Sequence, residues 1–277
     1  MPKTGLVLSG GAAWGLANVG VLDVFEREKF PIDCIAGSSM GSIIAGAYAL
    51  GVPLTTIHET IRSLSTFAIA RPVWPPFRGG FHGGLFRHRV DELLRPVIGD
   101  ALIGDCRIPF LCPAARVRKP IVWSRIFRKD FAERFLASIE YYVFPPETRL
   151  LDAMMASSAV PVIFAPAHVS GDTFIDLLYM GAVPARRLHD ACHPDILIGT
   201  DTNPRHAKLQ NFLPSGFREL LRYQYAELDA DLRACNVVIT PTMPAAEWRF
   251  GKGEAFIEAG RKAAEGALPA LRLNLST

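Results

Sequence analysis

Cysteine is scarce in this 277-residue chain, and its five positions show no metal-binding or redox spacing. They lie far apart, without a CxxC pair, at Cys34, Cys106, Cys112, Cys192 and Cys235. An odd number of widely spaced cysteines is typical of reduced thiols in a cytosolic protein rather than of a secreted disulfide framework. We therefore expect a cytoplasmic protein, peripheral at a membrane at most, with no metal ion and no cofactor.

The chain also has little net charge, because 30 Lys and Arg residues stand against 27 Asp and Glu residues, a formal charge of +3. That balance gives no reason to expect a nucleic-acid partner. Disorder is excluded as well, because 49% of the residues are hydrophobic and 21% are charged. No repeat and no linker divides the sequence, so we expect residues 1–277 to form a single domain.

One uncharged run, residues 34–57, is long enough to span a bilayer. Its helix-breaking residues argue against a membrane helix, and they are Gly37, Gly41, Gly46, Gly51 and Pro53. We interpret the run as a buried strand followed by a buried helix. The apolar stretch at residues 5–8 is too short for a signal peptide.

Hydrophobic periodicity predicts strands and helices along most of the chain. Short apolar runs predict strands at 5–9, 34–36, 110–117, 121–127, 174–176, 196–199 and 237–240. Amphipathic spacing predicts helices at 16–29, 39–50, 53–65, 85–97, 151–157, 216–234 and 253–271. Strands that alternate with helices through short connections favour an α/β fold, a three-layer α/β/α sandwich around a mainly parallel central sheet.

The segment Gly37-Ser38-Ser39-Met40-Gly41 matches the pattern G-x-S-x-G between a predicted strand and a predicted helix. A nucleophilic serine at such a junction sits on a sharp turn at positive φ, and the residues two positions away must be small. Ser39 is therefore the candidate nucleophile, and Gly37 and Gly41 complete the nucleophile elbow. The alternative is that the serines only cap the helix.

A second glycine-rich segment, Ser9-Gly10-Gly11-Ala12, follows the first predicted strand. Backbone N–H groups that are exposed in such a loop bind anions. The sequence lacks the Lys-Ser/Thr pair of a P-loop and the acidic residue of a dinucleotide site. We therefore expect an oxyanion hole lined by Gly10, Gly11 and Ala12, with the N–H groups of Gly11 and Ala12 as donors. A purely structural turn is the alternative.

Together these segments resemble the patatin-like phospholipase family in its bacterial type. Leu6–Gly20 is similar to the family's glycine-rich oxyanion segment, and Ala36–Gly41 to its nucleophile elbow. Ala156–Pro184 is similar to its aspartate region, and Gly253–Gly260 to its closing helix. The resemblance implies the three-layer fold and a dyad of Ser39 and Asp176. Such a dyad hydrolyses acyl esters of lipids through an acyl-enzyme, so the implied partner is a lipid or ester substrate.

The sequence departs from the family pattern at two places. Ala12 and Trp14 stand where the family usually has a third glycine and a cation, and an alanine keeps its backbone donor in place if its φ is negative. Leu177 stands where the family has a glycine after its aspartate. We expect a negative φ at Leu177 and a bend displaced toward Gly181. A catalytically impaired lipid-binding protein and an acyltransferase that uses the same site are therefore alternatives.

Asp176 is the preferred general base on position and pattern together. Two other aspartates follow predicted strands or turns, but Asp172 fits a hairpin loop and Asp201 fits a cap. A triad of Ser39, Asp176 and His206 would have the chain order of an α/β-hydrolase. That fold places its nucleophile after several strands, whereas Ser39 follows only the second.

Basic residues are concentrated in one part of the chain. The segment Arg71–Arg134 carries 13 Lys and Arg residues and 6 Asp and Glu residues. Aromatic residues interleave with these cations, at Trp74, Phe77, Phe81, Phe86, Trp123 and Phe131. Such a segment suits an anionic lipid interface, so transient contact with a membrane surface is predicted. The alternative is that the aromatic residues belong to the core and the cations are merely solvated.

Overall fold

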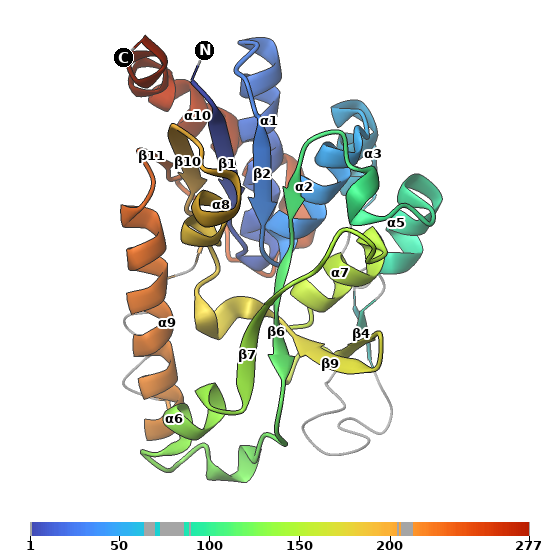
Figure 1. Ribbon diagram of the computed structural model, residues 1–277, viewed down its shortest axis with the longest axis vertical. Coiled ribbons are helices and arrows are strands. Elements are labelled where there is room, and N and C mark those ends of the chain that lie inside the picture. Colours follow the sequence, from blue (N-terminus) through green and yellow to red (C-terminus); the bar gives the residue numbers. More distant parts are fainter. Residues whose placement is uncertain are drawn as a thin grey trace.

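The computed structural model describes residues 2–63, 70–72, 86–88, 90–203, 205 and 213–276. Its centre is a parallel sheet with the strand order β11-β10-β1-β2-β5 (Figure 1). The predicted parallel sheet is thus confirmed. Its strands are β1 (Thr4–Leu8), β2 (Cys34–Gly37), β5 (Phe110–Leu111), β10 (Ile196–Thr200) and β11 (Val237–Ile239).

Alternate residues of the central strands face opposite layers, because side chains of a strand alternate between its two faces. Leu6 and Leu8 of β1 pack in one core with helices α1, α2 and α10, whereas Val7 packs in another core with helices α8 and α9. Helices therefore cover both faces of the sheet, as the three-layer prediction requires. The helices are α1 (Ala17–Arg27), α2 (Met40–Leu50), α3 (Leu54–Arg62), α5 (Val90–Ile98), α6 (Phe131–Leu136), α7 (Leu150–Ser157), α8 (Ala185–Cys192), α9 (Ser215–Arg233) and α10 (Gly253–Ser276).

Helices α1 and α10 cross with their backbones in contact. A Cβ atom on Gly20 would lie 1.9 Å from the carbonyl oxygen of Ile257, and one on Gly260 would lie 1.8 Å from that of Ala17. Since no side chain fits into either gap, both positions require glycine. The closing helix is thereby held against the helix that follows the first strand.

An antiparallel sheet with the order β7-β6-β9-β8 continues from β5. Figure 1 shows β6, β7 and β9 away from the end of the molecule that carries the two termini. Ile175, the last residue of β9, pairs with Ala115 of β6, and this pairing positions Asp176. The strands are β6 (Pro113–Val117), β7 (Ile139–Val143), β8 (Ala167–Val169) and β9 (Asp172–Ile175), and a separate pair consists of β3 (Ala70–Pro72) and β4 (Phe86–His88).

One predicted strand is wrong, and one predicted helix has a different start. A strand was predicted at residues 121–127, but they contain the 3₁₀ helix η4 (Trp123–Arg125), and β7 is the partner of β6. The reason is that pairing between distant residues, rather than a local pattern, decides which segment lies beside β6. The helix expected at 85–97 begins later, because β4 precedes α5.

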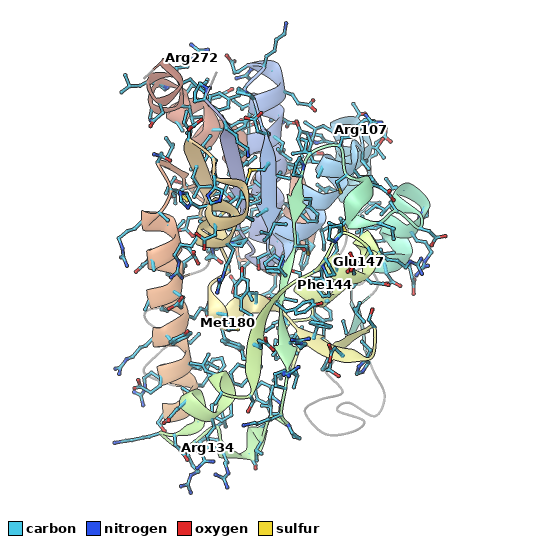
Figure 2. All side chains as sticks on the ribbon, in the orientation of Figure 1. Arg107, Arg134, Phe144, Glu147, Met180 and Arg272 are labelled. Carbon is cyan, nitrogen blue, oxygen red and sulfur yellow. A yellow bond between two sulfur atoms is a disulfide. The ribbon has the colours of Figure 1, made fainter. Side chains whose placement is uncertain are left out.

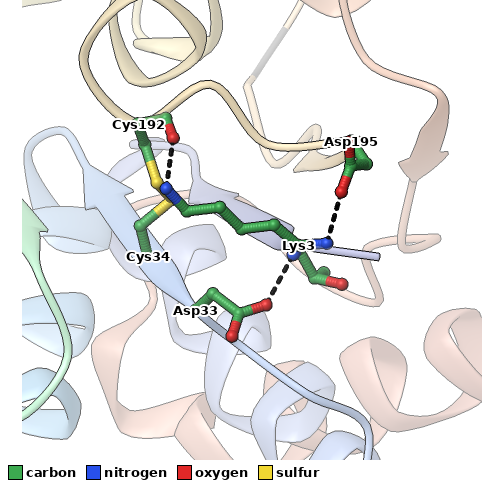
Figure 3. Close-up of a disulfide and its surroundings, with 6 residues drawn as sticks. Lys3, Asp33, Cys34, Cys192 and Asp195 are labelled. Carbon is green, nitrogen blue, oxygen red and sulfur yellow. Dashed lines mark hydrogen bonds between the residues drawn. A yellow bond between two sulfur atoms is a disulfide. The ribbon is translucent and has the colours of Figure 1, made fainter. Parts of the chain in front are cut away.

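A disulfide joins Cys34 and Cys192, so the expectation of reduced thiols is wrong for this pair (Figure 3). Cys34 begins β2 on the face covered by α8, and Cys192 is the last residue of α8. The Lys3 ammonium group donates a hydrogen bond to the carbonyl oxygen of Cys192. Because 158 positions separate the two cysteines, local spacing could not reveal the pair. The cytoplasmic location thereby loses the support of the cysteine pattern.

The uncharged run 34–57 forms β2, α2 and the start of α3, as the sequence indicated. Within the described part of the chain, none of the helices combines the length and the apolar character that crossing a bilayer requires.

Candidate functional site

The two predicted motifs meet at the carboxyl edge of the parallel sheet. From β1 the chain continues to β2 on one side, and it later returns to β10 on the other side. Such a switch in strand order leaves a crevice in which ligands bind. The loop after β1 touches the turn after β2, because a Cβ atom on Gly10 would lie 3.0 Å from the Cβ atom of Ser39.

Ser39 occupies a strained turn between β2 and α2. Its φ of 54° and ψ of −128° lie in a region that residues with side chains rarely adopt, and the positive φ was expected. A Cβ atom on Gly37 would lie 2.3 Å from the carbonyl oxygen of Gly41, and one on Gly41 would lie 2.1 Å from that of Leu8. The N–H group of Ser39 donates to Ser157 Oγ at 3.1 Å. Close backbone contacts and this hydrogen bond therefore hold the turn.

Asp176 directly follows β9 and is only 2% exposed. Its Oδ1 accepts the N–H group of Leu178 at 2.7 Å, whereas its Oδ2 forms no hydrogen bond of good geometry. Burial raises the pKa of this carboxyl to about 6, against smaller lowering by the Ser39 hydroxyl and the Leu178 N–H group. The Ser39 hydroxyl therefore lies close enough to Asp176 to affect the pKa of its carboxyl group.

The other two aspartates considered from the sequence are engaged elsewhere. Asp172 forms an ion pair with Arg116 at 3.1 Å, and Asp201 forms one with Arg205 at 3.0 Å. Of the three aspartates, Asp176 lines the same cavity as the candidate nucleophile. The structure therefore brings together the pair that the family resemblance implied.

The glycine-rich loop offers two free backbone donors. Within the described part of the chain, the N–H groups of Gly11 and Ala12 have no hydrogen-bond partner, and both residues line the cavity. Gly10 differs, because its N–H group donates to the carbonyl oxygen of Ala182 at 3.2 Å. The condition of a negative φ at Ala12 is not met, since its φ is 51°. An alanine thus occupies a conformation that favours glycine, and the donor is nevertheless free.

Two threonines that sequence reasoning did not single out hold this loop. The Thr200 hydroxyl oxygen accepts the N–H group of Ser9 at 2.9 Å, and the N–H group of Thr202 donates to Ser9 Oγ at 2.9 Å. The Thr202 hydroxyl also donates to the carbonyl oxygen of Gly10. Their position at the end of β10, beside β1, is the signal that could have identified them.

The departures from the family pattern have structural counterparts. The Trp14 side chain donates its Nε1–H to the carbonyl oxygen of Ala245 at 2.6 Å. Leu177 is not among the residues with positive φ and Gly181 has a φ of 95°, both as expected. The chain forms a 3₁₀ helix, η5 (Leu177–Met180), rather than continuing the strand. Leu177 is buried in the core and Leu178 lines the cavity.

The cavity that these residues share has a volume of about 500 Å³ and a largely apolar lining. Trp123 and Ile126 form one wall, and Phe217 and Leu221 of α9 form another. Gln224 of α9 is a polar exception that the sequence did not reveal. It is 5% exposed, and its Oε1 has no hydrogen-bond partner in the described structure. The site therefore suits an apolar chain with a polar group beside it.

A metal centre receives no support from the residues that the structure describes. Among them, no group of three His, Cys, Asp or Glu side chains could hold a metal ion. His206, the third member of the alternative triad, lies outside the described residues. The roles of the individual site residues stay predictions.

A model of the patatin-like phospholipase family matches residues 6–189, which is well over half of the chain. The chain therefore belongs to the patatin-like phospholipase family, and the resemblance stated from its motifs is confirmed. Membership supports a lipid ester hydrolase at the level of the family.

Curated relatives match parts of the chain. A lysophospholipase NTE1 of Kluyveromyces lactis is 39% identical over 137 residues, which are 48% of this chain and 9% of that protein. A lysophospholipase NTE1 of Candida albicans is 30% identical over 142 residues, 48% of this chain and 10% of that protein. An uncharacterized NTE family protein of Mycobacterium tuberculosis is 27% identical over 176 residues, 63% of this chain and 42% of that protein. The chain thus spans less than half the length of these relatives.

One solved structure, VipD from Legionella pneumophila, is similar with a TM-score of 0.44 and 12% sequence identity. The similarity covers 96% of this chain and 67% of VipD.

Proposed function

We propose that the chain is a serine acyl hydrolase that cleaves acyl esters of lipids. The observation that supports this proposal is the convergence of Ser39, Asp176 and the free N–H groups of Gly11 and Ala12 on one cavity. Acyl transfer requires a nucleophile, a base and anion-binding donors within reach of one carbonyl group, in a site from which bulk water is largely excluded.

In the proposed reaction, Asp176 accepts the hydroxyl proton of Ser39 as the serine oxygen attacks the acyl carbonyl carbon. The N–H groups of Gly11 and Ala12 donate hydrogen bonds to the oxyanion. The ester bond then breaks, and Asp176 returns the proton to the departing alcohol. Water attacks the acyl-enzyme in the same way, which releases the fatty acid and restores Ser39. With a pKa near 6, Asp176 is ionised at neutral pH and more basic than an ordinary aspartate.

The proposed substrate class is a lysophospholipid or another monoacyl lipid with a free hydroxyl group near its ester. Two relatives carry the name lysophospholipase. The buried Oε1 atom of Gln224, which has no partner among the described residues, can accept a hydrogen bond from a hydroxyl group. A substrate without that hydroxyl would leave the buried amide oxygen unpaired, and sites of this kind discriminate strongly against such substrates.

Labelling with a fluorophosphonate and hydrolysis of lysophosphatidylcholine test the proposal together. We expect the wild type and the control Ser38→Ala to be labelled and Ser39→Ala to be neither labelled nor active, with a loss of roughly 1000-fold or more. Circular dichroism should show an unchanged fold. Near-normal hydrolysis by Ser39→Ala would refute the nucleophile. A folded wild type that is neither labelled nor active would favour the lipid-binding alternative, and acyl transfer to an added alcohol in preference to water would favour the acyltransferase.

We also propose that the protein makes transient contact with a membrane surface through the basic segment Arg71–Arg134. Within it, Trp123 and Phe131 are buried, as the core alternative expects. Phe127 is 74% exposed, however, and Val122 is 53% exposed. Phe110 of the same segment is buried as well, and the side chains of Trp74, Phe77, Phe81 and Phe86 lie outside the described part. The exposed pair supports a membrane contact through the connection between β6 and α6.

A further inference from the structure

A second cavity, of about 220 Å³, lies between the β6–α6 connection and helix α6. Arg134, one of its lining residues, is labelled in Figure 2 at the end of the molecule opposite the two termini of Figure 1. The cavity is separate from the one that contains Ser39. Its lining combines the cations Lys119, Arg125 and Arg134 with the apolar residues Ile121, Phe131 and Phe135.

The charge of this cavity is positive and largely uncompensated. None of the residues that line it is acidic. Asp130 pairs with Arg134 at 2.7 Å, whereas Lys119 and Arg125 have no ion pair among the described residues. Two unpaired cations on the rim of a cavity attract an anion, and a phosphate group has the charge and the acceptor oxygens to bind both.

Exposed apolar side chains accompany the cations. Val122 lines the cavity, and Phe127 follows two positions after Arg125. A single exposed apolar residue is common on protein surfaces. An exposed phenylalanine among cations is instead suited to the boundary between lipid headgroups and acyl chains. The combination favours the phosphate of an anionic lipid over a phosphate in solution.

The segment of residues 121–126 forms a wall that this cavity shares with the candidate active site. Ile121, Val122 and Arg125 line the cationic cavity, whereas Trp123 and Ile126 line the cavity that contains Ser39. An occupant of the first cavity therefore contacts the same short segment that bounds the second.

We propose that the cationic cavity binds the headgroup phosphate of an anionic membrane lipid, with Phe127 and Val122 entering the bilayer beside it. The site holds the chain on the membrane and places the shared wall, residues 121–126, of the cavity that contains Ser39 at the lipid surface. Its consequence for catalysis rests on the proposed function, but the binding itself requires no hydrolysis.

Vesicle binding by the full chain carrying Ser39→Ala tests the site without substrate turnover. We compare vesicles of phosphatidylcholine alone with vesicles that also contain phosphatidylglycerol. The variant Lys119→Gln/Arg125→Gln should bind the anionic vesicles roughly 30-fold more weakly, which is the expected contribution of two cations near an anionic surface. Phe127→Ser should also weaken binding. The matched control Lys262→Gln/Arg272→Gln removes two exposed charges from α10 and should bind as before.

Three results would overturn the proposal. Equal weakening by the control would show that net charge alone attracts the chain, and equal binding to neutral vesicles would show that no anion is recognised. Tight binding of inorganic phosphate with no preference for anionic vesicles would assign the cavity to a soluble anion.

Hydrolysis of the water-soluble ester p-nitrophenyl butyrate reports the proposed function separately. The cavity variants, without Ser39→Ala, should keep this activity. If anionic vesicles bind as expected and the wild type hydrolyses no ester, the proposed function fails and the headgroup site stands. If the wild type hydrolyses the ester but does not bind anionic vesicles as expected, only the headgroup site is overturned.

Discussion

Replacing Asp176 by asparagine removes a buried ionisable group while nearly preserving its shape. Because burial raises the pKa of Asp176 from 3.8 to about 6, the folded state holds this proton more tightly than the unfolded chain does. The ionised carboxylate therefore destabilises the fold at neutral pH. We expect Asp176→Asn to be more stable than the wild type at neutral pH and inactive as a hydrolase.

The size of the effect follows from the two pKa values. At high pH the ionisation costs the folded state about 3 kcal/mol, since one pKa unit corresponds to about 1.4 kcal/mol. The stability that the protonated carboxyl contributes is fully present below its unfolded pKa of 3.8, and it is lost as the pH rises through about 6. The asparagine does not titrate. The stability advantage of the variant should therefore grow by about 2 to 3 kcal/mol between about pH 4 and about pH 8.

Urea unfolding of both proteins across this pH range measures the difference directly, because every other ionisable group contributes equally to both curves. The slope of the free energy with urea should be the same for the two proteins. A stability difference that stays constant with pH would refute the reasoning, since it would show that the carboxylate is not desolvated in the fold.

The same ionisation should give kcat/KM an acidic limb near pH 6. An ordinary histidine has a pKa of about 6.5, so the kinetic limb alone would not separate a serine–aspartate dyad from a triad with His206. The pH-dependent difference in unfolding free energy between the wild type and Asp176→Asn distinguishes the two, because it reports the ionisation of the Asp176 carboxyl group itself. A limb near pH 6 without the unfolding difference would assign the titration to another residue.

Three further substitutions test other parts of the structure. Gly41→Ala should abolish fluorophosphonate labelling and lower the melting temperature, because its Cβ atom would lie 2.1 Å from the carbonyl oxygen of Leu8. Gln224→Leu should leave stability unchanged or higher, but it should lower kcat/KM for a lysophospholipid about 10- to 100-fold relative to an analogue without the hydroxyl. An equal loss for both substrates would argue against the proposed role of the amide. Ala12→Gly should raise the free energy of unfolding by roughly 0.5 to 1 kcal/mol in urea denaturation, because alanine is strained at a φ of 51°. The matched Ala13→Gly should lower it, because Ala13 is fully buried and does not have a positive φ.

The central sheet was predictable because each of its strands is a short apolar run and each neighbouring helix has its own periodic face. The pattern fails where pairing between distant segments decides the structure. Residues 121–127 are as apolar as many strands, but β6 pairs with residues 139–143. Strand pairing depends on the residues that lie opposite, and a local pattern does not contain that information. The disulfide escaped prediction for the same reason.

The residues of the candidate site also differ in whether a local sequence pattern reveals them. Ser39 and the glycine-rich loop are continuous motifs, and their close backbone contacts follow from the residues within them. Gln224 and Thr202 enter the site only because α9 and β10 bring them there. Nothing in the residues around Gln224 marks it in the sequence, since a glutamine on an amphipathic helix is ordinarily solvated. A buried amide oxygen without a partner is recognisable only in three dimensions.

The bond between Cys34 and Cys192 closes a covalent ring that includes both Ser39 and Asp176. A protease that cuts the chain once inside this ring leaves two pieces that remain one molecule, with the serine and the aspartate still joined. A cut between Cys192 and α9 instead frees the C-terminal piece, with α9 and α10, from any covalent link to either residue. Electrophoresis with and without a reducing agent would distinguish the two cuts. The two residues proposed to act together are therefore tied by the chain's own connectivity, independently of the packing that aligns them.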